Sequence, residues 1–381
     1  MKPFLTEKFA NASAVHQEGA EARRAVEDAR GRVATALQVR PEFVTFTSGG
    51  TESNNLAILG IVEHLLSLGK TSGDMEVVTT RIEHPSVLNT MMALEKRGVE
   101  VKYVGVDAKG FVSIQELQSL LSAKTVLFSV AYANSEIGVV QKVHAIKKAL
   151  DAAEKKFKTK IMFHLDAAQA PLWLSCKFDT LQADLLALDV GKCHGPKGVG
   201  VLVRSRRATL ASTLFGGGQE SGLRPGTENV AGMVGASVAL TEAQKDFKTR
   251  AQIVAKIRDA GIEHLLKEIP QSVLNGPTGE DRLANNINIS IPGLDTEFAT
   301  VVLDKHGFAV STKSACAGAG GGESVVVQAI SDDPARSCPP ELAQARARST
   351  LRISLSPQTT FQNLKDLTKV LKAHLEKMSK Y

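Results

Sequence analysis

The sequence predicts an α/β fold with a mainly parallel sheet covered by helices, followed by a smaller α/β unit in the C-terminal third. Short apolar segments of strand length alternate with longer segments whose apolar residues recur every three or four positions. Strands that are apolar along their whole length are typical of a parallel sheet buried on both faces. The chain has 381 residues, of which 43% are hydrophobic, so it can form two or three domains with a large core.

The first two thirds contain most of this alternation. Ala22, Val26, Ala29 and Val33 share one helical face, which makes the first helix the clearest. We expect helices at 16–37, at 52–68, from Pro85 onward, at 114–121 and at 145–157. We expect strands at 43–47, 77–80, 99–104, 126–131, 161–165 and 185–188.

The pattern changes after a long helical segment at 229–269. Beyond Pro270 we expect strands at 287–291 and 351–355, and helices at 296–306 and 358–378. These segments predict a large domain over residues 15–249 and a small domain that combines residues 250–381 with residues 1–14.

The composition argues against several classes of protein. The 46 Lys and Arg residues against 40 Asp and Glu residues give a net charge of only +6. Basic runs such as residues 155–160 are usually solvent-exposed faces of helices, so we expect no nucleic-acid partner. No apolar run approaches the ~20 residues of a membrane span, and the N-terminus carries Glu7 and Lys8 in place of a signal core. We therefore expect a cytoplasmic protein. Its four scattered cysteines predict neither a disulfide framework nor a metal site.

Several short segments with chemical potential follow predicted strands, whose ends would meet along one edge of a parallel sheet. Residues 47–52 (TSGGTE) join a strand to a helix, so they form either a simple tight turn or a phosphate site at a helix N-terminus. His84 could stack on a ring or move protons, or it could be a capped surface residue. Residues 134–138 (NSEIG), taken alone, are a polar loop.

Charged residues follow two further apolar strands. Asp166 needs a partner, which could be a cationic ring nitrogen or an internal salt bridge. Lys192 could form a Schiff base if its pKa is lowered, although a surface lysine is the ordinary alternative. Cys316 lies in a loop of small residues, where a thiol is accessible. Arg352, on an apolar strand, needs a carboxylate from the protein or from a substrate.

The order and spacing of these segments together resemble the cysteine desulfurase family (NifS/IscS-like). That family lies in the class V aminotransferase group of the fold-type-I pyridoxal 5'-phosphate (PLP) enzymes. The resemblance runs from about Asn11 to the C-terminus. The matching segments are TSGGTESNN, EHPSVL, NSEIGVVQ, HLDAAQA, GKCHGPKGVG, GGGQESGLRPGTENV, SACAGA and LRISLS.

The resemblance implies how the cofactor is held. Lys192 would carry PLP covalently and later move a proton between the substrate and the cofactor. Asp166 would pair with the protonated pyridine nitrogen, and Gln169 would reach the phenolic oxygen. Gly50 and Thr51 would bind the phosphate at the start of a helix.

Further roles follow from the same resemblance. His84 would stack on the ring and assist acid–base steps, and Ser135 would occupy the position of a ring-oxygen contact. Thr227 would bind phosphate from the partner subunit, which implies a homodimer. Asn134 and Arg352 would bind the substrate, Arg352 through the substrate carboxylate.

The implied reaction converts L-cysteine to L-alanine. Cys316 would accept the sulfur as a persulfide and pass it to an acceptor protein, in iron–sulfur cluster assembly or tRNA thiolation. Two alternatives stay open, namely a related PLP lyase or aminotransferase, such as a selenocysteine lyase, and a non-catalytic scaffold protein. The retained Cys316 favours desulfuration, and failure to bind PLP would favour the scaffold.

The sequence also departs from the family pattern. The family's usual segment before the Asn-Pro-Ser-Ser-x-x-His element is absent ahead of Asn11. At the cofactor lysine, the usual Ser-x-His-Lys is replaced by residues 189–192 (DVGK), so Asp189 would repel a phosphate unless it is protonated or points away. Ser135 is shorter than the usual Asn. Residues 325–340 resemble an insertion that could alter partner docking.

Overall fold

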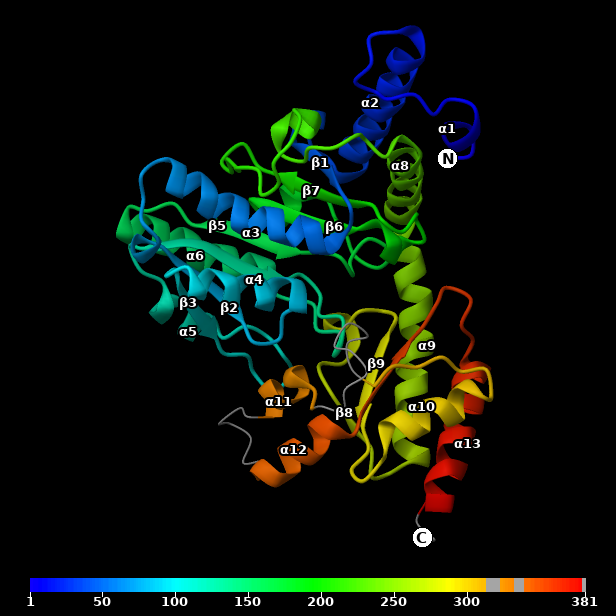
Figure 1. Cartoon of the computed structure of the whole chain (residues 1–381). Helices are drawn as coiled ribbons and strands as arrows, with labels where there is room; N and C mark the ends of the chain where they lie inside the picture. Colours follow the sequence, from blue (N-terminus) through cyan, green and yellow to red (C-terminus); the bar gives the residue numbers. More distant parts are fainter. Residues whose placement is uncertain (313–322, 332–338, 379–381) are drawn as a thin grey trace.

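The computed structural model describes residues 1–312, 323–331 and 339–378. A seven-stranded sheet dominates the fold (Figure 1), in the order β1-β7-β6-β5-β4-β2-β3. Strands β2 to β6 run parallel, whereas β7 is antiparallel to both of its neighbours. The strands are β1 (Val44–Thr47), β2 (Glu76–Thr80), β3 (Glu100–Val104), β4 (Thr125–Ala131), β5 (Met162–Asp166), β6 (Leu185–Asp189) and β7 (Gly200–Arg204).

Helices cover both faces of this sheet because its strands are apolar on both faces. In β6, Leu185 and Ala187 belong to the core beneath α3 and α4, whereas Leu186 and Leu188 belong to the core beneath α2, α5, α6 and α8. The helices are α1 (Pro3–Thr6), α2 (Gln17–Leu37), α3 (Gly50–Ser67), α4 (Pro85–Lys96), α5 (Ile114–Leu120), α6 (Val143–Phe157), α7 (Phe178–Leu181) and α8 (Val230–Lys245).

A three-stranded antiparallel sheet, in the order β10-β9-β8, forms the C-terminal part. Its strands are β8 (Val273–Leu274), β9 (Asn286–Ser290) and β10 (Thr350–Ser354). The helices of this part are α9 (Phe247–Glu268), α10 (Thr296–Asp304), α11 (Val325–Ser331), α12 (Pro340–Arg348) and α13 (Phe361–Met378). In Figure 1, α9 continues from α8 into this part, and the short N-terminal α1 lies beside α8.

The structure confirms the α/β class and nearly all the expected elements, and it adds the short elements α1, α7 and β8, which were not expected. Strand β7 (Gly200–Arg204) was also not expected; it pairs antiparallel with β6, to which a short loop connects it. The helix expected at 229–269 is two helices, which meet at Asp246. Helices α11 and α12 lie in and just after the suspected insertion. The division into domains at residue 249 stays a prediction.

Candidate active site

A cavity of about 420 Å³ lies where parallel strands β4, β5 and β6 end. Asn285 and two residues of β10 contribute to its wall, so residues beside both sheets enclose it. It contains most of the residues that the sequence analysis selected, namely Gly50, Thr51, His84, Asn134, Ser135, Asp166, Gln169, Lys192 and Arg352. Segments far apart in the sequence therefore meet at one site, as expected for the carboxyl edge of a parallel sheet.

Asp166, the last residue of β5, is a buried carboxylate in this cavity. Its Oδ1 accepts a hydrogen bond from the Ala168 amide at 3.0 Å, and its Oδ2 accepts one from Asn54 Nδ2 at 2.8 Å. Burial raises the pKa of Asp166. Among the described residues, no lysine or arginine nitrogen lies within 4.0 Å of it. The described chain thus offers hydrogen bonds to this group but no salt bridge.

A chain of hydrogen bonds connects Asp166 to His84. Asn54 Nδ2, which contacts Asp166, also donates to Ser86 Oγ at 2.9 Å. Ser86 Oγ lies 2.8 Å from His84 Nδ1, and the Ser86 amide donates to the same nitrogen at 3.1 Å as His84 caps α4. Because Nδ1 accepts the amide proton, the neutral imidazole carries its own proton on Nε2.

Sequence reasoning missed both linking residues. Asn54 and Ser86 lie inside motifs that the resemblance used, TSGGTESNN and EHPSVL, but nothing in their spacing distinguished them. Asn54 is 1% exposed and lines the cavity, and its Oδ1 is a buried acceptor with no hydrogen-bond partner in the described residues. Such an orphaned acceptor indicates that a ligand or water occupies the space beside it.

The turn at residues 48–50 places the start of α3 at the cavity. Gly49 has φ 154° and ψ 179°, a conformation suited to glycine, and provides no side-chain cap. A Cβ on Gly200 would lie 2.4 Å from the Gly49 carbonyl carbon, so the close approach of β7 also requires glycine. The first amide groups of α3 have no helical acceptor, and the positive end of the helix dipole favours an anion there.

Lys192 lies just beyond the end of β6, in a short 3-10 helix at Val190–Cys193. Lys192 is exposed and lines the cavity. Asp189, the last residue of β6, starts this turn because its Oδ1 accepts a hydrogen bond from the Gly191 amide at 2.9 Å. The strand thereby positions Lys192 on the same cavity as Asp166.

The loop after β4 connects the two sheets. Asn134 Oδ1 accepts hydrogen bonds from the amides of Glu136 and Ile137 at 2.8 and 2.9 Å, and its Nδ2 donates to the Ile82 carbonyl at 2.7 Å. The Ser135 carbonyl accepts a hydrogen bond from Arg352 Nη1 at 3.3 Å. The Asn134 amide thus shapes the loop, and Arg352 is oriented toward the cavity from β10.

Glu83, which precedes His84, is a buried acid that the sequence analysis did not select. It is 4% exposed, and Thr80 Oγ1 donates to its Oε1 at 2.5 Å. Burial, with a smaller contribution from the Asp166 charge, raises the pKa of Glu83 to about 8. At neutral pH this carboxyl is therefore mostly protonated and does not add a full negative charge beside Asp166.

Two selected residues do not line this cavity. Thr227 is exposed, just before Asn229 caps α8. Cys316 lies outside the described residues. The described chain on either side of its segment is anchored near the site, because Ser311 pairs with Arg352 through both backbone groups and Ser324 Oγ donates to the buried Glu136.

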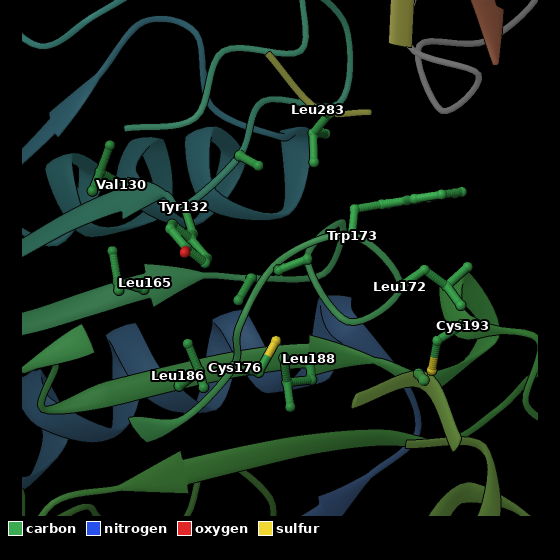
Figure 2. Close-up of a cluster of buried hydrophobic side chains, with 14 of the residues drawn as sticks. Val130, Tyr132, Leu165, Leu172, Trp173, Cys176, Leu186, Leu188, Cys193 and Leu283 are labelled. Atoms are coloured by element: carbon green, nitrogen blue, oxygen red, sulfur yellow. The ribbon is translucent and has the colours of Figure 1, made fainter. Parts of the chain in front are cut away.

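Cys176 and Cys193 are buried members of the hydrophobic core shown in Figure 2. Burial raises the pKa of the Cys193 thiol to about 12 and raises that of Cys176 as well. Neither thiol has the accessible, ionisable character of a nucleophile. Within the described ranges, no group of three metal-ligating side chains could hold an ion, and no helix is long and apolar enough to cross a membrane.

Comparison with known proteins shows the family. Residues 1–367 match the family described as aminotransferase class-V. The cysteine desulfurase IscS of Dictyoglomus turgidum is 37% identical over 99% of this chain and 90% of its own length. IscS of Clostridium botulinum is 36% identical over 97% and 88%.

Solved structures agree with these sequence matches. A NifS-like protein superimposes with a TM-score of 0.86 at 31% identity, covering 98% of this chain and 94% of its own. DndA from Streptomyces lividans gives a TM-score of 0.73 at 30% identity, covering 92% and 93%. The chain therefore belongs to the class-V aminotransferase family and, within it, to the cysteine desulfurases.

Proposed function

We propose that this protein is a PLP-dependent cysteine desulfurase that converts L-cysteine to L-alanine and holds the sulfur on Cys316. The observation that carries this proposal is one cavity that combines Lys192 with the buried Asp166, a carboxylate that has no cationic partner in the described chain. A protonated pyridine nitrogen would supply that partner. The relatives named cysteine desulfurase support the reaction.

The residues present fit PLP, which is the cofactor of this family. Lys192 would hold it covalently, Asp166 would pair with its ring nitrogen, and the orphaned Asn54 Oδ1 lies on the wall beside Asp166. The amides at Gly50 and Thr51 would receive its phosphate. When bound, the cofactor withdraws electrons from the substrate Cα, which makes the reaction at the neighbouring Cβ possible.

The substrate would be held by its carboxylate on Arg352, which the Ser135 carbonyl and the pairing with Ser311 orient. His84 lies on the cavity, and its Nε2 carries the proton of the neutral ring, so it would donate or hold a proton there. The Ser86 and Asn54 side chains fix the orientation of that imidazole. Lys192, once free, would move a proton at the substrate Cα.

Sulfur transfer requires a thiolate, and Cys316 is the candidate. Its sulfur would bond to the substrate sulfur as the substrate Cβ–S bond breaks. The electron pair of that bond stays with the carbon skeleton, which takes up a proton and leaves as alanine. Cys316 follows Ser311 by only five residues, a tether of at most about 18 Å, and Ser311 is paired with Arg352 beside the cavity.

The proposal extends to assembly and partners. We propose a homodimer in which Thr227, exposed on its own chain, approaches the partner's phosphate site. We also propose a cytoplasmic location and a sulfur-acceptor protein that receives the persulfide, as in iron–sulfur cluster assembly or tRNA thiolation. The name IscS among the relatives supports the first of these pathways.

The test follows the absorption spectrum of the protein loaded with PLP and then measures alanine and persulfide after L-cysteine is added. We expect a cofactor band that Lys192→Ala abolishes, and alanine formation that Cys316→Ser abolishes while the band is kept. A Lys192-dependent band without sulfur release would refute desulfuration and point to another PLP reaction. No band at any PLP concentration would refute the enzyme and favour a scaffold protein.

A further inference from the structure

The side chain of Asp189 lies where the cofactor phosphate is expected. A Cβ placed on Gly50, the first residue of α3, would be 3.1 Å from Asp189 Cβ and 3.5 Å from Asp189 Oδ2. The other carboxylate oxygen, Oδ1, accepts the hydrogen bond from the Gly191 amide. One oxygen thus fixes the turn that contains Lys192, and the second lies beside Gly50, the first residue of α3.

Among the described residues, the Asp189 carboxylate has no ion-pair partner. In the described part of the chain, no lysine or arginine nitrogen lies within 4.0 Å of Asp189. Glu52, the acid in the first turn of α3, differs, because it pairs with Arg224 at 3.1 Å. Asp189 lines the cavity and adds to the charge around Asp166, whose pKa its proximity helps to raise.

We propose that Asp189 occupies the anion position at the start of α3 when no cofactor is bound, so that the phosphate of PLP must bind against a like charge. Negative charge at a helix N-terminus is favourable, which makes Asp189 an internal substitute for the phosphate. The consequence is weak, reversible cofactor binding in which the phosphate contributes little to affinity. This inference rests on the proposed function, since it concerns how the same site takes PLP.

Removal of the charge should therefore change the affinity for PLP selectively. For neighbouring like charges near a protein surface, we expect about a ten- to hundredfold tighter Kd for PLP in Asp189→Asn. Asparagine keeps the oxygen that accepts the Gly191 amide, so the turn should be preserved. Pyridoxal, which lacks the phosphate, should bind both proteins with similar Kd values.

The experiment titrates cofactor-free protein with PLP and, separately, with pyridoxal, and reads Kd from the absorbance change. Asp189→Ser provides a second variant in case Asp189→Asn fails to fold. Asp107→Asn is the matched control, because Asp107 Oδ1 also accepts a hydrogen bond from an amide two residues ahead, at Lys109, but it does not line the cavity. Thermal unfolding of the cofactor-free proteins, with and without inorganic phosphate, gives a readout that does not depend on covalent binding.

Two results would support the inference, namely tighter binding of PLP but not pyridoxal by the Asp189 variants, and stabilisation of these variants by phosphate above that of the wild type. Equal Kd values for PLP in wild type and both variants, each with a Lys192-dependent band, would overturn the inference and leave the proposed function intact. An equal gain in affinity for PLP and for pyridoxal would also overturn the inference, since the effect of Asp189 would then not act through the phosphate. If neither the wild type nor any folded variant gave a Lys192-dependent band, both this inference and the proposed function would fail.

Discussion

The buried Glu83 predicts a specific dependence of stability on pH. Its pKa is about 8 in the folded chain, against an ordinary value of 4.5. Below pH 4.5 the carboxyl is protonated in both folded and unfolded chains, so its contribution to stability is fully present. Between pH 4.5 and 8 the unfolded chain releases this proton and the folded chain keeps it, so the contribution is lost as the pH rises through the folded value.

The substitution Glu83→Gln removes this titration and keeps a similar shape. A pKa difference of about 3.5 units corresponds to roughly 4–5 kcal/mol, so the free energy of unfolding of the wild type should fall relative to that of the variant by up to this amount. Urea unfolding of the cofactor-free proteins at a series of pH values, followed by the fluorescence of the single Trp173, measures the difference.

The matched control is Glu116→Gln, at an exposed glutamate on α5. Its stability should follow that of the wild type across the same pH range. If the wild type and Glu83→Gln lose stability in parallel from pH 5 to 8, Glu83 is not held protonated in the folded chain, and our assignment of a neutral Glu83 beside Asp166 would be wrong.

Two substitutions test other parts of the site. Asn54→Leu should lower the free energy of unfolding by about 2–4 kcal/mol and weaken PLP binding, because Asp166 and Ser86 lose a hydrogen-bond donor. The control Asn55→Leu lies outside the cavity and should change PLP binding little. Equal effects of the two substitutions on PLP binding would contradict the role of Asn54. Gly200→Ala should raise the Kd for PLP, because the added Cβ would displace the Gly49 backbone. The control Gly31→Ala has open space around its Cβ and should leave this Kd unchanged. An unchanged Kd in Gly200→Ala would show that the close approach of Gly200 to Gly49 does not shape the site.

The sequence predicted the elements whose pattern is local. The apolar runs of β4 and β6 and the amphipathic spacing of α2 determine these elements without reference to the rest of the chain. Strand β7 was missed because its short Gly200–Arg204 segment adjoins the glycine-rich loop after Lys192. One of its two partners, β1, also lies far earlier in the sequence. The break between α8 and α9 was missed because the residue at the break, Asp246, is neither a proline nor a glycine.

For the site, the sequence predicted residues that end strands or start helices. Asp166, His84 and Lys192 could be selected because their positions imply a chemical need. Asn54 and Ser86 could not, because their importance arises from contacts between segments 32 and 112 residues apart. The repulsion expected of Asp189 depended on its direction, and only the structure places its Oδ2 beside the start of α3.

The destination of the substrate sulfur tests the central claim most directly. The PLP-loaded protein would receive sulfur-labelled L-cysteine, and mass spectrometry of its peptides would locate the label. Our account predicts one added labelled sulfur on the peptide of Cys316, and none on Cys338 or on the buried Cys176 and Cys193. Alanine formation with no label on Cys316, or with label on another cysteine, would contradict it.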